Sequence, residues 1–215
     1  MLLFSCIPQK NVRSAVDFNF GWRFALSDNP QYSDPDFDDT PWRELHLPHD
    51  WSIEGSFDRN NPSTPSGGAL PGGIGWYRKT FDAAPRHGTR VCLEFDGVFM
   101  NSSVYVNGSL LGTRPYGYSS FCYDITDVLR DGRNVVAVRC DNSEQPNSRW
   151  YAGCGIYRDV RLVTVPEVHV RYNGMYVTTE GSEVTARAEV CGEAESLEFV
   201  VADARGRTVA SKAAE

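Results

Sequence analysis

The sequence predicts an all-β protein, a jelly-roll β-sandwich followed by a truncated immunoglobulin-like β-sandwich. Apolar and polar residues alternate over short runs, as at Val91, Leu93 and Phe95, and this period is typical of a strand with one buried face. The runs are bounded by Gly, Pro, Asn and Asp, which favour turns. Helix signals are few, so the pattern favours strands that assemble into packed sheets.

The individual strands follow from the same alternation. The Asn-Gly pair at 107–108 separates two such runs and predicts a hairpin, because both residues tolerate a positive φ. Residues 124–132 are expected to hold one helical turn, with Thr126 or Asp127 as the N-cap and Gly132 as the terminator. The other alternating sets are Trp22, Phe24 and Leu26; Val104 and Val106; Phe121, Tyr123 and Ile125; Val136 and Val138; and Ile156, Val160 and Leu162.

A change of pattern at Val165-Pro166-Glu167 divides the chain. We expect an N-terminal segment at 1–16, a jelly-roll domain at 17–165 and a partial sandwich at 166–215. The last segment has short strands with turns expected at Asn173-Gly174, Glu180-Gly181 and Gly206. An immunoglobulin-like sandwich needs about 100 residues, so this segment is interpreted as its first few strands.

The composition limits the classes of partner. The net charge of −7 argues against nucleic acid, because phosphate backbones select basic surfaces. No apolar run approaches the roughly 20 residues of a transmembrane helix.

The N-terminal LFSC sequence, which ends at Cys6, is similar to the end of a bacterial lipoprotein signal. A remnant of such a signal predicts a periplasmic or cell-envelope location. If residues 1–6 are instead an ordinary N-terminus, the predicted location is the cytoplasm.

The cysteines and histidines do not predict a metal site. The six cysteines are spread along the chain without a CxxC pair, and the four histidines lack ligand spacing. Neither a disulfide scaffold nor a structural zinc site is expected, and no cofactor or metal is assigned.

One long segment, residues 52–75, interrupts the strand pattern. It is rich in Gly, Pro, Ser and Asn. Loops beyond about 12–15 residues are usually functional or disordered, and both alternatives stay open here.

Six motifs occur in one order along residues 17–165. They are DFNFGWRF (17–24), PWRELHLPHDW (41–51), GWYRKTF (75–81), FDGVFMNSSVYVNGSLLG (95–112), GYSSFCYDITDVL (117–129) and RWYAGCGIYRDV (149–160). Together they resemble the amino-terminal sugar-binding domain of family 2 glycoside hydrolases, most closely the β-galactosidases. The resemblance implies a galactose-binding-like jelly roll at 17–165, then an immunoglobulin-like domain and a barrel with two catalytic glutamates.

No catalytic residue is assigned in this chain. A retaining glycosidase needs two carboxyl groups about 5–5.5 Å apart, and the implied barrel needs at least about 200 residues. Glu44, Glu94, Glu144 and Glu198 match no catalytic motif of the family and are interpreted as exposed residues on a β surface.

The substrate-binding candidates are Arg149 and Trp150, which with Tyr151 precede a turn between Gly153 and Gly155. The glycines permit backbone angles that lift the preceding residues out of the sheet. Aromatic faces pack on sugar C–H patches, and arginine binds hydroxyls or carboxylates. The resemblance implies that this segment reaches the active site, where some members have an aspartate in place of Arg149. Simple packing is the alternative.

Three further motifs are interpreted structurally. In LPHDW, His49 and Asp50 are expected to satisfy loop backbone groups, and Trp51 to cover the edge of the core. GWYRKTF is interpreted as an amphipathic strand that packs in the core, with Trp76, Arg78 and Thr80 on one face and Tyr77, Lys79 and Phe81 on the other. Arg158 is placed on the apolar face of a strand from Ile156, where it requires an aspartate partner.

Three functional hypotheses follow. The first is the non-catalytic front part of a β-galactosidase-like hydrolase, whose partners are a β-galactoside and the barrel of the same chain, with a homo-oligomer left open. β-Glucuronidase and β-mannosidase share this architecture. The second is a free-standing carbohydrate-binding module, and the third is a purely structural role.

Overall fold

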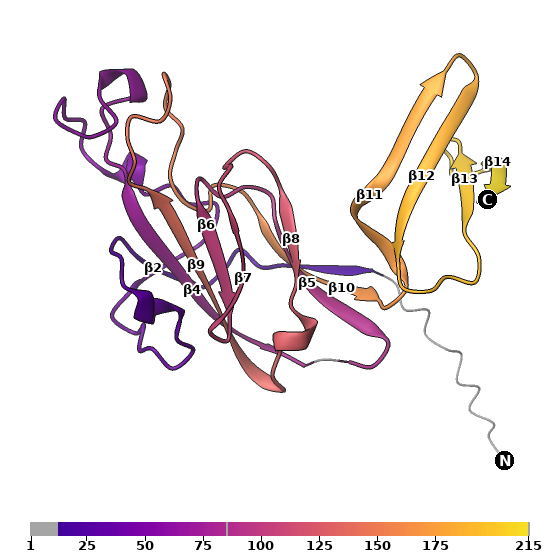
Figure 1. Ribbon diagram of the computed structural model, residues 1–215, viewed down its shortest axis with the longest axis horizontal. Coiled ribbons are helices and arrows are strands. Elements are labelled where there is room, and N and C mark those ends of the chain that lie inside the picture. Colours follow the sequence, from indigo (N-terminus) through magenta and orange to yellow (C-terminus); the bar gives the residue numbers. More distant parts are fainter. Residues whose placement is uncertain (1–12, 85, 215) are drawn as a thin grey trace. The chain divides into compact units, whose positions relative to one another are not determined.

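The computed structural model describes residues 13–84 and 86–214, and the LFSC sequence with Cys6 lies outside these described residues. Strands dominate the structure (Figure 1), which confirms the all-β prediction. The chain divides into two compact units, one formed by Arg13–Thr164 and the other with residues 165–214 as its described part.

The Arg13–Thr164 unit is a sandwich of two sheets. The six-stranded sheet has the order β3-β2-β4-β9-β6-β7, and the four-stranded sheet has the order β1-β10-β5-β8. The strands of the larger sheet are β2 (Trp22–Ala25), β3 (Arg43–Leu45), β4 (Gly73–Ala83), β6 (Ser102–Val106), β7 (Ser109–Arg114) and β9 (Gly132–Asn142). Those of the smaller sheet are β1 (Ser14–Asp17), β5 (Thr89–Phe95), β8 (Phe121–Asp124) and β10 (Val160–Pro166). Four short 3-10 turns lie between strands: η1 (Pro30–Ser33), η2 (Ser52–Glu54), η3 (Pro65–Gly67) and η4 (Thr126–Val128).

The core lies between the two sheets. Leu93 and Phe95 of β5 meet Tyr77 of β4 and Val136 and Val138 of β9, and all five side chains are buried in one apolar cluster. This arrangement follows from the alternation in the sequence, because each strand presents one face to the opposite sheet.

Strand β4 packs in the core as predicted, but its middle is buried on both faces, so the prediction of an amphipathic strand is wrong. Tyr77 points into the core, while Trp76 and Arg78 on the other face are also buried. The segment that carries η1 covers this outer face. The Trp76 indole donates to Asp28 at 2.9 Å, and the Arg78 guanidinium donates to Asp39 at 2.8 Å and to the Asp34 carbonyl at 2.9 Å.

The predicted hairpin at 107–108 is confirmed between β6 and β7, with both residues at positive φ. The helical turn is also present as η4, but its N-cap is Ile125. The Thr126 hydroxyl instead accepts a hydrogen bond from the Val91 backbone at 2.8 Å. The capping prediction was wrong because this hydroxyl bonds the neighbouring strand rather than its own turn.

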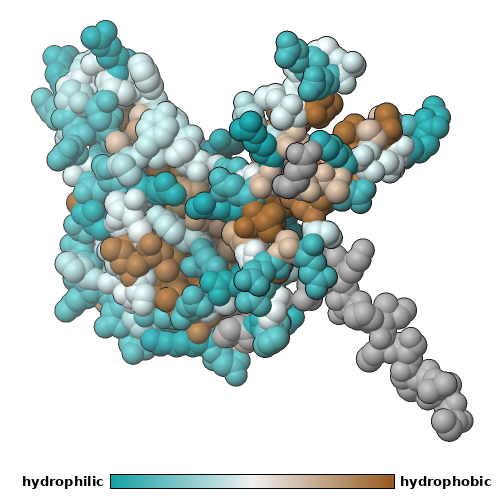
Figure 2. All heavy atoms as spheres, turned by 45° about the vertical axis from the view of Figure 1, so that its right-hand side comes forward, coloured by the Kyte–Doolittle hydropathy of each residue, from teal (hydrophilic) through white to brown (hydrophobic). Residues whose placement is uncertain are grey.

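The second unit contains two antiparallel hairpins, β11 (His169–Glu180) with β12 (Glu183–Cys191) and β13 (Glu198–Ala202) with β14 (Thr208–Ala213). Hydrophobic residues are exposed on these hairpins, and Figure 2 shows such residues in brown. Met175, Val177 and Val184 are among the exposed residues. Asn173-Gly174 was predicted to be a turn, but β11 continues through it. Asn173 has a φ of 54°, and the register shifts between Val170 and Met175, so the pair forms a bulge.

One of the four glutamates differs from its prediction. Glu44, Glu144 and Glu198 are exposed as expected. Glu94 is buried on β5, where its carboxylate pairs with the Arg13 guanidinium at 2.6 Å. The alternation of residues along β5 does not reveal that Arg13 packs on the face that carries Glu94.

Candidate functional site

Two loops meet at one end of the six-stranded sheet. Strand β4 begins at Gly73, and its register partner is Asn142, the last residue of β9. The loop that leads into β4 and the loop that leaves β9 therefore lie at the same end of the sheet, which is at the upper left of Figure 1.

Asp50 joins these loops. Its carboxylate accepts from the backbone N–H of Ser52 at 2.9 Å, from the backbone N–H of Cys154 at 2.9 Å, and from the Tyr151 hydroxyl. The prediction that Asp50 satisfies loop backbone groups is confirmed. Burial, together with the Asp50 carboxylate, raises the pKa of Tyr151, so its hydroxyl remains a donor at neutral pH. Residues 151–154 are thus fastened to the 50–52 turn.

Asn142 supports the same segment from the other side. Its buried amide donates to the Gly153 carbonyl at 3.1 Å and to the Cys154 sulfur at 3.0 Å, and it accepts from the Asn147 amide. Burial raises the pKa of the Cys154 thiol to about 11, so this cysteine is a protonated part of the scaffold near neutral pH.

The 52–75 segment is a compact loop fastened by its own hydrogen bonds. The Asp58 N–H donates to the Ala69 carbonyl at 2.9 Å, and the Ser63 hydroxyl donates to the Leu70 carbonyl at 2.7 Å. These hydrogen bonds describe an ordered loop, which argues against the disordered alternative; a functional role of this loop stays a prediction.

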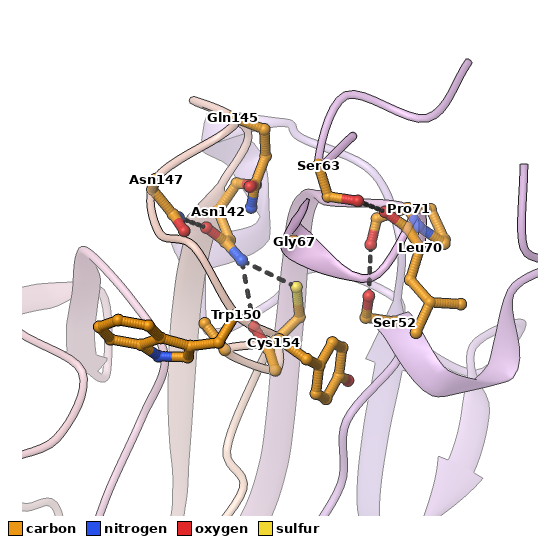
Figure 3. Close-up of a pocket in the computed structure, with 13 residues that line it drawn as sticks. Ser52, Ser63, Gly67, Leu70, Pro71, Asn142, Gln145, Asn147, Trp150 and Cys154 are labelled. Carbon is orange, nitrogen blue, oxygen red and sulfur yellow. Dashed lines mark hydrogen bonds between the residues drawn. The ribbon is translucent and has the colours of Figure 1, made fainter. Parts of the chain in front are cut away.

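A small pocket lies between the two loops (Figure 3). It is lined by Ser52, Ser63, Leu70, Asn142, Trp150 and Cys154, among others. The free space inside is about 10 Å³, which is room for one water molecule. A sugar ring does not fit, so any carbohydrate contact uses the exposed surface beside the pocket.

Trp150 supplies such a surface. Its side chain is 62% exposed, and in Figure 3 its indole extends away from Ser52 and Ser63. Arg149 is exposed as well, and among the described residues it makes no ion pair. The structure therefore places both predicted binding residues side by side on the solvent-facing edge of a segment whose next residues are anchored.

The two predicted glycines hold the backbone bend behind Trp150. Gly153 has a φ of +80° and Gly155 a φ of +103°, in the region that other residues avoid. A Cβ on Gly155 would lie 2.1 Å from the Tyr77 hydroxyl oxygen. Gly155 also exchanges two backbone hydrogen bonds with Phe99, at 2.6 and 2.8 Å. Only glycine fits this position without displacing its neighbours.

The prediction for Arg158 is wrong. The strand does not start at Ile156 but at Val160, and Arg158 lies in an exposed bend with no ion pair among the described residues. The bend after Gly155 breaks the two-residue period, so Arg158 is not on the apolar face. The aspartate pairing occurs instead at Arg161, whose guanidinium contacts Asp96 at 2.5 and 2.9 Å.

A partly buried polar cluster, from the buried Tyr77 to the exposed Arg43 and Glu54, lies behind the site. Ring nitrogen Nδ1 of His49 is 2.7 Å from the Tyr77 hydroxyl, and Nε2 is 2.9 Å from Arg43 and 3.2 Å from Glu54. Sequence reasoning assigned His49 only to loop backbone groups, and it missed Tyr77, whose alternation indicated core packing alone. Burial lowers the pKa of His49, although Glu54 opposes this effect.

This cluster predicts a pH dependence of stability. Below the ordinary histidine pKa of about 6.5, the unfolded chain binds a proton at His49 more readily than the folded chain does. The free energy of unfolding therefore falls as the pH drops from 7.5 to 5.5. We expect the difference in stability between the unmodified protein and His49→Gln to shrink over this range in urea titrations. A difference that stays constant with pH would contradict this assignment.

Two kinds of feature are absent from the described part of the chain. No group of His, Cys, Asp or Glu in residues 13–84 and 86–214 is arranged to hold a metal ion. In the same residues, no helix has the length and apolar character needed to cross a membrane.

The fold agrees with comparisons to known proteins. The family model described as "Glycosyl hydrolases family 2, sugar binding domain" matches residues 16–166. The chain belongs to glycosyl hydrolase family 2. This confirms the resemblance that the six motifs indicated.

Relatives within family 2 include galactosidases and glucuronidases. The chain is 50% identical to the "Beta-galactosidase BoGH2A" of Bacteroides ovatus over 92% of its own length and 25% of that protein. It is 33% identical to a "Beta-glucuronidase" of Bacteroides fragilis over 78% of its length and 23% of that protein. The crystal structure of a β-glycosidase from Bacteroides vulgatus superposes with a TM-score of 0.87 at 35% identity, covering 93% of this chain and 27% of that one. The chain thus spans about a quarter of the length of these relatives.

Proposed function

We propose that this chain is the sugar-binding part of a β-galactosidase-like enzyme that hydrolyses terminal β-galactosides with retention of configuration. The observation that supports this most is the exposed indole of Trp150 on an anchored segment, in a chain 50% identical to a protein named as a β-galactosidase. An indole face packs well on the C–H patch of a pyranose ring. The anchored neighbours reduce the entropy lost on binding.

We place the catalytic groups in a barrel domain of the same polypeptide. Retention requires a nucleophile and an acid/base about 5–5.5 Å apart. The four glutamates considered in this chain are either exposed or, for Glu94, held in an ion pair. The sugar-binding domain supports the barrel, and Arg149 and Trp150 contribute to binding of the sugar at its edge.

The test is steady-state kinetics of the complete enzyme with an aryl β-galactoside. We expect Trp150→Ala to lower kcat/KM by at least about tenfold, which corresponds to about 1.4 kcal/mol of lost transition-state binding. Trp150→Phe retains an aromatic face and should recover part of this loss. Phe20→Ala removes another exposed aromatic ring of the same unit and serves as the control. Unchanged kinetics for Trp150→Ala would reduce this residue to a packing role.

A β-glucuronidase is the second candidate, supported by the glucuronidase relative and by Arg149. A guanidinium without a carboxylate partner is suited to bind the carboxylate of a uronic acid. Parallel assays with aryl β-galactoside and aryl β-glucuronide separate the two. If the enzyme prefers the glucuronide, and Arg149→Ala loses this preference, the enzyme is a β-glucuronidase and the first proposal is wrong.

A free-standing carbohydrate-binding module is the third candidate. It predicts micromolar affinity of the 215-residue chain for galactose or lactose in calorimetric titration. The first proposal predicts weak binding at most, because the sugar site is completed by the barrel.

A further inference from the structure

A second aromatic surface lies next to the Trp150 segment. Three tyrosines form it, Tyr116, Tyr118 and Tyr157, and we call it the tyrosine surface. The side chains of Tyr116 and Tyr118 are 62% and 45% exposed. The centre of the Tyr118 ring is 5.7 Å from that of Tyr116 and 6.5 Å from that of Tyr157.

The scaffold beneath holds these rings in place. The buried Phe99 ring packs edge-on against Tyr118 at 5.2 Å between centroids. A Cβ on Gly117 would lie 2.2 Å from the Phe99 ring, and one on Gly97 would lie 2.8 Å from the Tyr157 ring. The two glycines thus let the Phe99 and Tyr157 rings pack directly against the backbone. The Tyr157 hydroxyl also donates a hydrogen bond of 2.9 Å to the Gly117 carbonyl.

Residues 99–101 contact both the Trp150 segment and the loop that carries Tyr116 and Tyr118. On one side, Phe99 pairs with Gly155, and the Asn147 amide lies 3.4 Å from the Met100 sulfur. On the other side, the Asn101 N–H donates to the Pro115 carbonyl at 3.3 Å. The two loops, one with Trp150 and the other with Tyr116 and Tyr118, therefore lie on either side of the short 99–101 segment.

The chemistry of the surface fits carbohydrate. Tyrosine offers a rigid apolar face and a hydroxyl, which match the C–H patches and hydroxyl groups of sugar rings. Arg158 adds an exposed planar donor next to Tyr157.

We propose that the tyrosine surface binds further units of an oligosaccharide whose terminal sugar lies on Trp150. This inference rests on the proposed function and narrows its substrate class from small galactosides to galactose-terminated oligosaccharides. Because each exposed ring adds a face for a sugar unit, two exposed rings should give a preference of about tenfold or more for the longer substrate.

The experiment compares two substrates of the complete enzyme, a β-1,4-galactotetraose and an aryl β-galactoside. We expect Tyr116→Ala combined with Tyr118→Ala to lower the ratio of the two kcat/KM values at least tenfold. Tyr116→Phe with Tyr118→Phe keeps both rings and should keep most of the ratio. Tyr176→Ala is the matched control, because Tyr176 is also 62% exposed but lies on β11 of the other unit.

The outcomes separate this inference from the proposed function. An enzyme that cleaves neither substrate refutes the proposed function. An active enzyme whose ratio is unchanged in the double Ala variant overturns the inference alone. Nitration of the ligand-free complete enzyme gives an independent result. Tyr116 and Tyr118 should react and become protected by the tetrasaccharide, and resistance without sugar would show that another part of the protein covers them.

Discussion

Arg78→Ala is expected to lower the free energy of unfolding of the Arg13–Thr164 unit by about 3–5 kcal/mol, the range found when one partner of a buried ion pair is removed. The guanidinium is fully buried and donates to Asp39 and to the carbonyls of Tyr32, Asp34 and Phe37. Its loss leaves the partly buried Asp39 carboxylate without its closest partner and these carbonyls unpaired. The segment that covers β4 then loses its attachment, and Trp76 becomes accessible.

Tryptophan fluorescence follows this unfolding, since every tryptophan of the chain lies in this unit. At about 2–4 °C for each kcal/mol, we expect Tm to fall by about 10 °C. Arg90→Ala is the control, because Arg90 pairs with Asp124 and Asp127 in a largely exposed position. Exposed pairs of this kind contribute about 0–1 kcal/mol. Equal losses for the two variants would mean that burial of Arg78 has no energetic consequence.

Gly155→Ala should have an effect of similar size on the site itself. The added methyl group meets the hydroxyl of Tyr77 and the ring of Trp51, and both of these side chains are buried. The φ of +103° adds strain for any residue with a Cβ. Overpacking costs about 1–3 kcal/mol and a strained backbone about 1–3 kcal/mol. We therefore expect both lower stability and a displaced Trp150 segment.

Two comparisons isolate the cause of this loss. Gly132→Ala also places a methyl group at positive φ, but nothing lies within 4 Å of it, so it measures the backbone strain alone. Tyr77→Phe removes the nearest atom, so Gly155→Ala should be less damaging in that background. If Gly132→Ala is as destabilising as Gly155→Ala, the close approach to Tyr77 does not explain the loss.

Local patterns predicted the strands and the family well. Alternation at Val91, Leu93 and Phe95 reports burial of one face by the opposite sheet, and all three side chains are buried. Asn-Gly at 107–108 forms the predicted hairpin between β6 and β7. These predictions succeed because the information lies within a few residues of the feature that it describes.

Predictions failed where a distant segment decides the environment. The outer faces of β4 and β5 are covered, so Arg78 and Glu94 are buried although the alternation indicated solvent. Arg158 moved from the apolar face to an exposed bend because the strand begins four residues later than expected. Asn173 forms a bulge because β12 continues to pair on both sides of it.

For the candidate site, the sequence by itself determined that Arg149, Trp150 and Tyr151 precede a glycine bend, since glycine spacing and residue type are local properties. Only the tertiary structure decided that Asp50 and Asn142 fasten this bend, and that Gly97 and Gly117 let the tyrosine surface form beside it. The hydrogen bonds of Asn142 and Asp50 join residues that are 11 and 104 positions apart along the chain. The contacts of Gly97 and Gly117 depend on close packing against aromatic rings. A pattern of neighbouring residues does not report which distant loop supplies a hydrogen bond or fills a gap.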